Sequence, residues 1–338
     1  MPRPPSARIR SRRARGRSRP PRWISLIALI ATLPAAAALD PETAAAAPVV
    51  PYHVPWRPGE NLAAFLPHLG DFRGTPPGAN DWNCKPSPAH PDPVILLSGA
   101  SVGPAQNYIF IAPLLANNGY CVFTLTYGID PTTVTPLPGN RDMRQVAAEE
   151  LAPFVDRVLD ATGAEKVDFL GHSEGTVMPR WYIKFLGGAQ KVAKSVNLAS
   201  LWNGSSLLGL NHLLEDARRN GSKAAIEAKA GTFTHSMLDF ITGSDYLNAV
   251  NEGQAFPLSV EYTSIVTRYD EGVVPYTSGI APPGPNITNI VLQDVCPADL
   301  SEHNFLAADP VVGQIILNAL DPANAQPIDC NGIPRNSG

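Results

Sequence analysis

The sequence lacks several features that would place it in a functional class at once. It has no C-x-x-C pair or histidine-rich spacing for zinc, no G-x-G-x-x-G or G-K-[ST] loop for phosphate, and no internal repeat. Only 17% of its residues are charged, whereas 35 are proline, a composition found in extracellular proteins with long ordered loops. The apolar run at residues 23–33 is shorter than the roughly 20 residues that span a bilayer. We therefore expect no metal, no cofactor and no membrane span.

The N-terminal segment has the composition of an export signal. Nine arginines crowd residues 1–22, the apolar run follows, and alanines then dominate residues 35–38 and 44–47. This order predicts a signal peptide over residues 1–46, cleaved between 38 and 47, and a secreted, extracellular protein. A membrane anchor or a basic nucleic-acid arm is the alternative. Residues 47–338, which remain after this segment is removed, carry a net negative charge. We therefore expect no nucleic-acid partner, because such a partner favours a basic surface.

The chain has four cysteines, Cys84, Cys121, Cys296 and Cys330. An even number behind an export signal predicts disulfides rather than free thiols. Three pairings are possible. We favour Cys84–Cys121 and Cys296–Cys330, because each pair is local in the sequence and brackets a loop.

Apolar runs alternate with helical patterns between residues 94 and 320. The expected strands are residues 94–97, 121–127, 166–170, 192–198, 259–267 and 287–292. Strands that alternate with helices predict an α/β fold with a mostly parallel central sheet, flanked by helices. The alternation breaks at residues 202–257, which we interpret as a cap or lid insertion (the cap segment) in a catalytic domain spanning residues 47–338.

The strongest local signal lies at residues 171–175, which read Gly-His-Ser-Glu-Gly and match G-x-S-x-G. The match follows an expected strand and precedes an expected helix, as in the nucleophile elbow of α/β hydrolases. A serine in such a sharp turn points its hydroxyl out of the sheet, and the helix N-terminus behind it favours developing negative charge. We predict that Ser173 is a catalytic nucleophile and that His172 is structural.

A serine nucleophile needs a base, and in this fold the chain order is Ser, acid, His. Among the three later histidines only His303 follows the last expected strand, whereas His212 and His235 fall in the cap segment. Asp270 directly follows the strand expected at residues 259–267, so we predict Asp270 as the acid. Its neighbour Glu271 is the obvious competitor.

The oxyanion of acyl transfer needs two backbone N–H donors. One belongs to the residue after the nucleophile, Glu174. The other is expected in the loop at residues 98–103, where Gly99 permits a sharp turn and Ala100 is the predicted donor.

Several stretches of the chain, including those that carry the candidate catalytic residues Asp270 and His303, are similar to a known family. The matching stretches are residues 80–87, 118–123, 178–188, 268–271, 275–277 and 299–303. They make the chain resemble the extracellular class 2 lipases of actinobacteria and, more distantly, the fungal lipase B type. The resemblance implies hydrolysis of triacylglycerol or other carboxylic esters, with Ser173 as nucleophile, Asp270 as acid and His303 as base. It also implies the same cysteine pairing.

The chain departs from the family pattern in three places. Ser98-Gly99 stands where the family usually has His-Gly, Glu174 where it has glutamine, and Thr176 where it has a second glycine. A carboxylate at Glu174 would oppose negative charge on the oxyanion, unless it points away or is paired.

The expected function is a monomeric, secreted lipase or carboxylesterase whose partners are lipid or ester substrates, with transient contact to a lipid interface. Leu208 and Leu213 in the cap segment are candidate acyl-chain contacts; an ordinary buried helix face or a dimer contact is the alternative. The other interpretations are an acyltransferase, a polyester hydrolase, or a non-catalytic binding protein on the same scaffold.

Overall fold

The computed structural model describes residues 51–57, 59–134, 136–231 and 234–338. The expected signal peptide and its cleavage region lie outside these residues. Among the helices of the described part, none is long and apolar enough to cross a membrane.

Six parallel strands form one sheet in the order β2-β1-β3-β4-β5-β6. The strands are β1 Val94–Leu97, β2 Val122–Thr124, β3 Val167–His172, β4 Val192–Leu198, β5 Glu261–Val266 and β6 Ile287–Val291. The expected α/β class with a parallel sheet is confirmed. Strand β2 is shorter than the apolar run at residues 121–127, because the chain leaves the sheet after Thr124 and directs the Tyr127 hydroxyl toward the Ser98 carbonyl.

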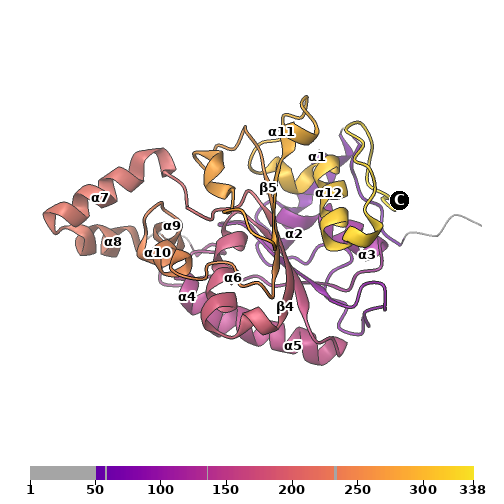
Figure 1. Ribbon diagram of the computed structural model, residues 1–338, viewed down its shortest axis with the longest axis horizontal. Helices are drawn as coiled ribbons and strands as arrows, with labels where there is room; N and C mark the ends of the chain where they lie inside the picture. Colours follow the sequence, from indigo (N-terminus) through magenta and orange to yellow (C-terminus); the bar gives the residue numbers. More distant parts are fainter. Residues whose placement is uncertain (1–50, 58, 135, 232–233) are drawn as a thin grey trace, which may run out of the picture. The chain divides into compact units, whose positions relative to one another are not determined.

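Helices cover both faces of the sheet (Figure 1). Helices α3 and α12, which contact each other, cover one face, and α5 and α6 cover the other. The helices are α1 Glu60–Phe65, α2 Pro104–Tyr108, α3 Ile111–Asn117, α4 Met143–Val146, α5 Ala152–Thr162, α6 Glu174–Phe185, α7 Leu210–Asn220, α8 Lys223–Gly231, α9 Ser236–Asp239, α10 Asp245–Asn251, α11 Leu292–Val295 and α12 Pro310–Leu320. A π-helical turn, Ala147–Leu151, joins α4 to α5. Asp142 caps α4 and Asp309 caps α12, each by accepting two backbone N–H bonds.

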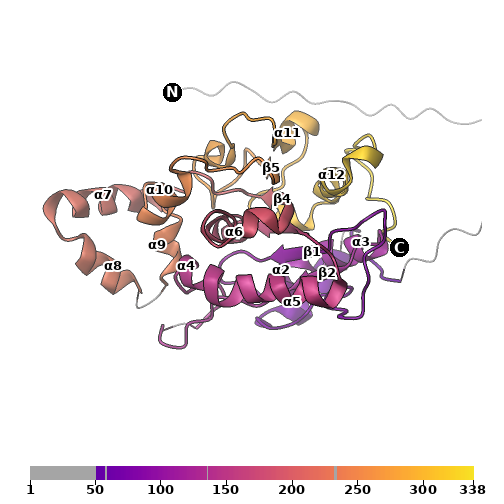
Figure 2. The same ribbon diagram turned by 60° about the horizontal axis from the view of Figure 1, so that its bottom comes forward.

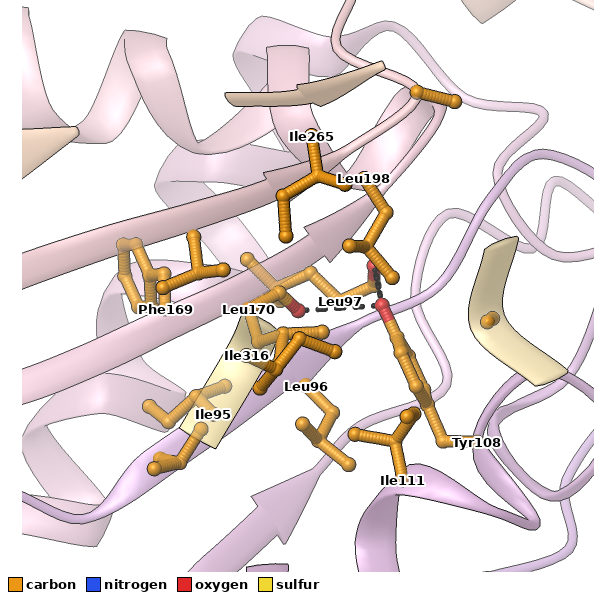
Figure 3. Close-up of a cluster of buried hydrophobic side chains, with 14 of the residues drawn as sticks. Ile95, Leu96, Leu97, Tyr108, Ile111, Phe169, Leu170, Leu198, Ile265 and Ile316 are labelled. Carbon is orange, nitrogen blue, oxygen red and sulfur yellow. Dashed lines mark hydrogen bonds between the residues drawn. The ribbon is translucent and has the colours of Figure 1, made fainter. Parts of the chain in front are cut away.

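The middle of the core contains β1 and β3, whose apolar side chains are almost fully buried. All four residues of β1 are fully buried, as a strand covered on both faces requires (Figure 3). The hydroxyl of buried Tyr108 donates to the Leu97 carbonyl at 2.7 Å and lies 3.2 Å from the Leu170 carbonyl. Helix α2 is thereby tied to the ends of both strands, where the loops of the site begin.

The cap segment contains no strand in its described part. It begins with a 3-10 turn, Leu207–Gly209, followed by α7 and α8, which project from one end of the domain (Figures 1 and 2). Its second half belongs to the core, because Ile241, Tyr246, Leu247 and Val250 are buried. The Tyr246 hydroxyl donates to the Val177 carbonyl of α6 at 3.0 Å. Within the described part of the cap segment, the α7–α8 hairpin is therefore what stands apart from the sheet and its covering helices.

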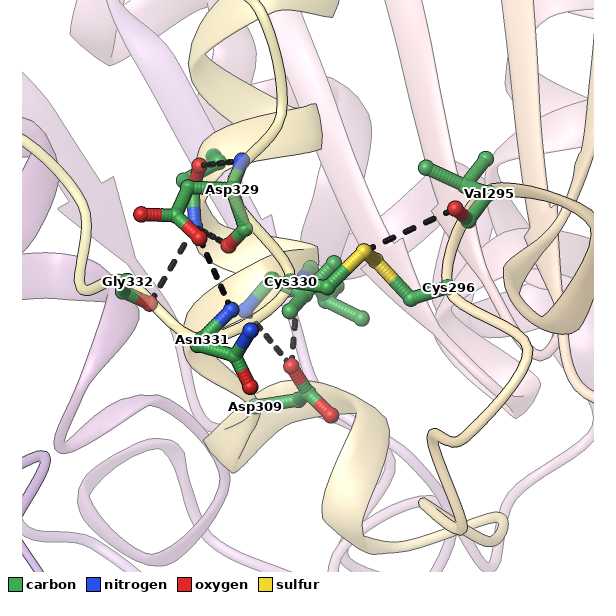
Figure 4. The surroundings of a disulfide bond; sticks show 10 residues. Val295, Cys296, Asp309, Asp329, Cys330, Asn331 and Gly332 are labelled. Carbon is green, nitrogen blue, oxygen red and sulfur yellow. Dashed lines mark hydrogen bonds between the residues drawn. A yellow bond between two sulfur atoms is a disulfide. The ribbon is translucent and has the colours of Figure 1, made fainter.

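The four cysteines form the disulfides Cys84–Cys121 and Cys296–Cys330, the same pairs that the sequence favours. Cys121 lies just before β2, so the first bond fixes the entry segment to the sheet. The second bond joins the end of α11 to the C-terminal segment that follows α12 (Figure 4). It thus anchors the chain shortly before His303.

Each disulfide should stabilise the fold by restricting the unfolded chain. Their sequence separations of 37 and 34 residues predict that replacing either pair by serine lowers the free energy of unfolding by roughly 3–4 kcal/mol in the chain-entropy model. Loss of Cys296–Cys330 should also lower kcat, whereas the matched loss of Cys84–Cys121 should not. Denaturant titration and ester turnover measure the two effects; equal kcat in both variants would refute the anchoring role.

Candidate active site

Ser173 occupies the sharp turn between β3 and α6. Its backbone has φ 54° and ψ −118°, in the left-handed half of conformational space that non-glycine residues rarely adopt. The turn demands glycine on both sides. A Cβ on Gly171 would stand 2.2 Å from the Gly175 carbonyl oxygen, and one on Gly175 would stand 1.9 Å from the Leu97 carbonyl oxygen. The backbone of Ser173 is further held by its N–H, which donates to the Leu198 carbonyl at 2.9 Å.

Ser173, His303 and Asp270 form one hydrogen-bonded chain. His303 Nε2 lies 2.9 Å from Ser173 Oγ, and His303 Nδ1 lies 2.8 Å from Asp270 Oδ1. The Asp270 side chain is 1% exposed, and its Oδ1 also accepts the N–H groups of Gly272 at 3.0 Å and Val273 at 2.6 Å. The structure therefore brings together, from three separate loops, the three side chains that the sequence selects.

The contacts of His303 define which nitrogen carries its proton. Nδ1–H donates to the Asp270 carboxylate, so Nε2 faces the serine hydroxyl with a lone pair. Burial alone would lower the pKa of the imidazole. The hydrogen bond and charge of Asp270, with smaller contributions from Glu271 and Glu302, outweigh burial and raise it above its ordinary 6.5. This arrangement suits a base that takes the serine proton and is stabilised once charged.

The competing candidates are engaged elsewhere. The Glu271 carboxylate accepts a hydrogen bond from the backbone N–H of His303 at 3.4 Å, and not from the His303 ring. Asp294 of α11, another carboxylate between Asp270 and His303 in the chain, pairs with Arg268 at 2.6 Å on the surface. His212 is exposed on α7 and lies 3.9 Å from Glu215, and His235 is exposed just before α9.

His172 links two parts of the site. Its Nε2 donates to the His303 carbonyl at 2.9 Å, and its Nδ1 faces the Asn107 amide at 3.0 Å. Asn107 Oδ1 in turn accepts the Gly99 N–H at 2.8 Å. Burial lowers the pKa of His172 to about 3, so the ring is neutral. Through this bridge His172 and Asn107 fix the position of His303 relative to the loop at residues 98–103.

The two predicted oxyanion donors lie on segments that flank the nucleophile. Glu174 begins α6, where N–H groups have no partner within the helix. Ala100 lies in a loop that is held at Gly99 by Asn107 and at Ser101, whose N–H donates to the Pro138 carbonyl at 2.9 Å. A Cβ on Gly99 would stand 3.3 Å from Ser173 Cβ, so this loop packs directly against the nucleophile.

A model of the family "Lipase (class 2)" matches residues 91–315. The chain belongs to the class 2 lipase family. Among solved structures it is similar to lipase B of Aspergillus fumigatus, with 17% identity, a TM-score of 0.57 and coverage of 80% of this chain. It spans 62% of the length of that lipase. It also matches the mature lipase BlEst2 of Bacillus licheniformis, with 14% identity, a TM-score of 0.48, and coverage of 70% of this chain and 94% of that one. The fold is that of the α/β hydrolases.

In this member of the class 2 lipase family an apolar cavity of about 260 Å³ lies beside the triad. Its apolar lining includes Leu62, Phe65, Val102, Phe110 and Phe305. His172 and Asn304, the chain neighbours of Ser173 and His303, also line it.

Leu213 of the cap segment lies away from this cavity. Leu213 is 51% exposed on α7, and Leu208 belongs to the 3-10 turn before it. Leu213 does not line the cavity beside the triad. Contact of either leucine with substrate stays a prediction.

Sequence reasoning missed Asn107 and the cavity residues. Asn107 lies on a helix with no local sign of its role, because the residues it joins are 8 and 65 positions away. Leu62 and Phe65 lie in a proline-rich entry segment, where the only signal was apolar spacing in a short helix. The described residues contain no group of three or more His, Cys, Asp or Glu that could hold a metal ion.

Replacing Asp270 with asparagine should lower kcat by about 10⁴, because the amide no longer holds the required His303 tautomer or stabilises its charged form. Glu271→Gln, the matched control, should change kcat by less than about threefold. In the wild type kcat/KM should fall with decreasing pH around a midpoint above 6.5, since the base must be neutral. Residual activity of Asp270→Asn should show a lower midpoint. A larger loss in Glu271→Gln would identify Glu271 as the acid instead.

Proposed function

We propose that the chain is a secreted carboxylic ester hydrolase that acts on acylglycerols or related esters through an acyl-Ser173 intermediate. The observation that carries the proposal is the hydrogen-bonded chain from Ser173 Oγ through His303 to the buried Asp270 carboxylate. Its support from the comparisons is the class 2 lipase family itself. Two disulfides are consistent with secretion.

The proposed reaction has two halves. Ser173 Oγ attacks the ester carbonyl carbon while its proton passes to His303 Nε2, and Asp270 stabilises the imidazolium. The backbone N–H groups of Ala100 and Glu174 are the proposed donors to the oxyanion. When the intermediate collapses, the C–O bond breaks and the alcohol leaves with the His303 proton. His303 then takes a proton from water as the water oxygen attacks the acyl carbon. The bond from that carbon to Ser173 Oγ breaks, His303 returns the proton to Oγ, and the acid is released.

The apolar cavity beside the triad supports an acyl or alkyl chain as part of the substrate. Its residues Leu62 and Phe305 are 59% and 55% exposed, so the cavity opens to solvent through apolar side chains. Such an opening also favours transient contact with a lipid surface.

Ser173→Ala should abolish turnover of p-nitrophenyl esters, a loss on the order of 10⁴ to 10⁶, with an unchanged melting temperature. A fluorophosphonate probe should label the wild type once, at Ser173, and should leave Ser173→Ala unlabelled. Ser259→Ala, a serine on the surface before β5, is the matched control and should behave like the wild type. A wild type that neither turns over esters nor reacts with the probe would instead be a binding protein on a hydrolase scaffold.

A chain-length series distinguishes the two candidate acyl sites. If the cavity holds the acyl chain, Phe305→Ala should lower kcat/KM for octanoate and longer esters by about tenfold, or ~1.4 kcal/mol of lost apolar contact, and leave acetate esters nearly unchanged. Leu213→Ser in α7 is the matched comparison. A length-dependent loss in Leu213→Ser alone would assign the chain to the cap segment. A uniform loss with a lowered melting temperature would make the altered residue structural.

A further inference from the structure

Glu174, the residue after the proposed nucleophile, has its side chain fully inside the protein. It is 1% exposed. The ideal Cβ position of Gly139 lies 2.6 Å from Glu174 Oε1 and 3.1 Å from Ala100 Cα. The absence of a Cβ on Gly139 therefore makes room for the carboxyl group, next to the loop that carries Ala100.

The groups around this carboxyl offer it oxygen lone pairs rather than protons. The hydroxyls of Tyr127 and Ser236 are the polar side chains that act on it, but Glu174 Oε2 is buried without a hydrogen-bond partner. Each hydroxyl has one proton, and each already donates it to a backbone carbonyl, Tyr127 to Ser98 and Ser236 to Gly139. A carboxylate, which only accepts, would compete with those carbonyls for two protons. A neutral carboxylic acid supplies a third proton and can donate it to either hydroxyl oxygen.

The charged group that acts on Glu174 from the packed helices is also acidic. It is Asp239 of α9, whose pKa burial and Asp142 raise to about 6. Asp239 is paired with Arg144 at 3.0 Å, so that guanidinium is already engaged.

Beyond Tyr127 lie two further titratable groups, the phenol of Tyr108 and the carboxylate of Glu150. Glu150 is bound by Arg141 at 2.7 Å. Burial, above all, raises the pKa of Glu174 well above its ordinary value. On the other side of Ser173 stand the neutral His172 ring and the His303–Asp270 pair.

We propose that Glu174 is a positioning residue of the oxyanion site, which as a neutral acid donates its one proton to the Tyr127 or the Ser236 hydroxyl and so ties the start of α6 to Ser98 or to Gly139. This role rests on the proposed ester hydrolysis, because it serves the N–H donors at Ala100 and Glu174. Gly139 packs against Ala100 and Ser98 lies two residues before it, so either link holds the loop that carries Ala100 against the start of α6. A neutral side chain there also adds no negative charge beside a developing oxyanion, where burial would make repulsion strong.

The protonation state can be tested without any substrate. A carboxyl whose pKa is raised in the folded state keeps its proton there, whereas the unfolded chain loses that proton above about pH 4.3. The free energy of unfolding therefore falls as the pH rises. Relative to Glu174→Gln, whose side chain is neutral at every pH, the unfolding constant of the wild type should increase about tenfold per pH unit between pH 5 and 7. Glu149→Gln on the exposed face of the π-helical turn is the matched control and should show no such trend.

The same comparison should be repeated in an Asp239→Asn background, because Asp239 titrates within this range. The Glu174→Gln trend should persist there. A pH-independent difference between wild type and Glu174→Gln would mean that the carboxyl is ionised in the folded protein and would overturn the inference while leaving the proposed function intact.

The positioning role has its own readout in turnover. Glu174→Gln keeps a donor and an acceptor and should retain kcat within about threefold at pH 7. Glu174→Leu, of similar size but without hydrogen bonds, should lower kcat by tenfold or more with little change in KM, since the oxyanion forms only after binding. Normal kcat in Glu174→Leu would refute the positioning role. A wild type without esterase activity or fluorophosphonate labelling would overturn the proposed function, and this role with it.

Discussion

The close contact between α6 and the ends of β1 and β3 is the constraint on which the site depends. The Leu97 carbonyl oxygen occupies the space that a Cβ on Gly175 would need, and the Gly175 carbonyl does the same at Gly171. Only with both glycines can the helix begin directly above the sheet. Ser173 then takes its left-handed conformation, and its hydroxyl emerges at the carboxyl edge of the strands, where the loops that carry Asp270 and His303 also end.

Around that contact the polar groups form a continuous set of supports. Tyr108 ties α2 to the ends of β1 and β3, and Asn107 on the same helix holds Gly99 and His172. His172 then reaches the backbone of His303. Because these groups are buried, each must be hydrogen-bonded, and their mutual satisfaction fixes the loops more tightly than apolar packing alone.

Two of the three departures from the usual family pattern, Thr176 and Glu174, lie beside the triad while its hydrogen bonds are kept. The Thr176 hydroxyl donates to the Ser173 carbonyl at 2.7 Å and accepts the Leu201 N–H at 3.2 Å, so its added atoms have partners inside the elbow. The Glu174 side chain turns away from solvent into a space that Gly139 leaves open. The backbone around the nucleophile is thus compatible with side chains that differ from the family's usual ones.

The sequence by itself predicted the alternation of strands and helices and the elbow at Ser173, because each depends on local patterns such as apolar runs and glycine spacing. It left three cysteine pairings possible and favoured the two that the structure contains. It also selected Asp270 and His303, since chain order and strand ends limit where an acid and a base can stand. Only the tertiary structure decided which buried groups face one another. Asn107 meets His172 across 65 residues and Ser236 meets Gly139 across 97. The protonation of Glu174 depends on such distant neighbours, and no local pattern encodes them.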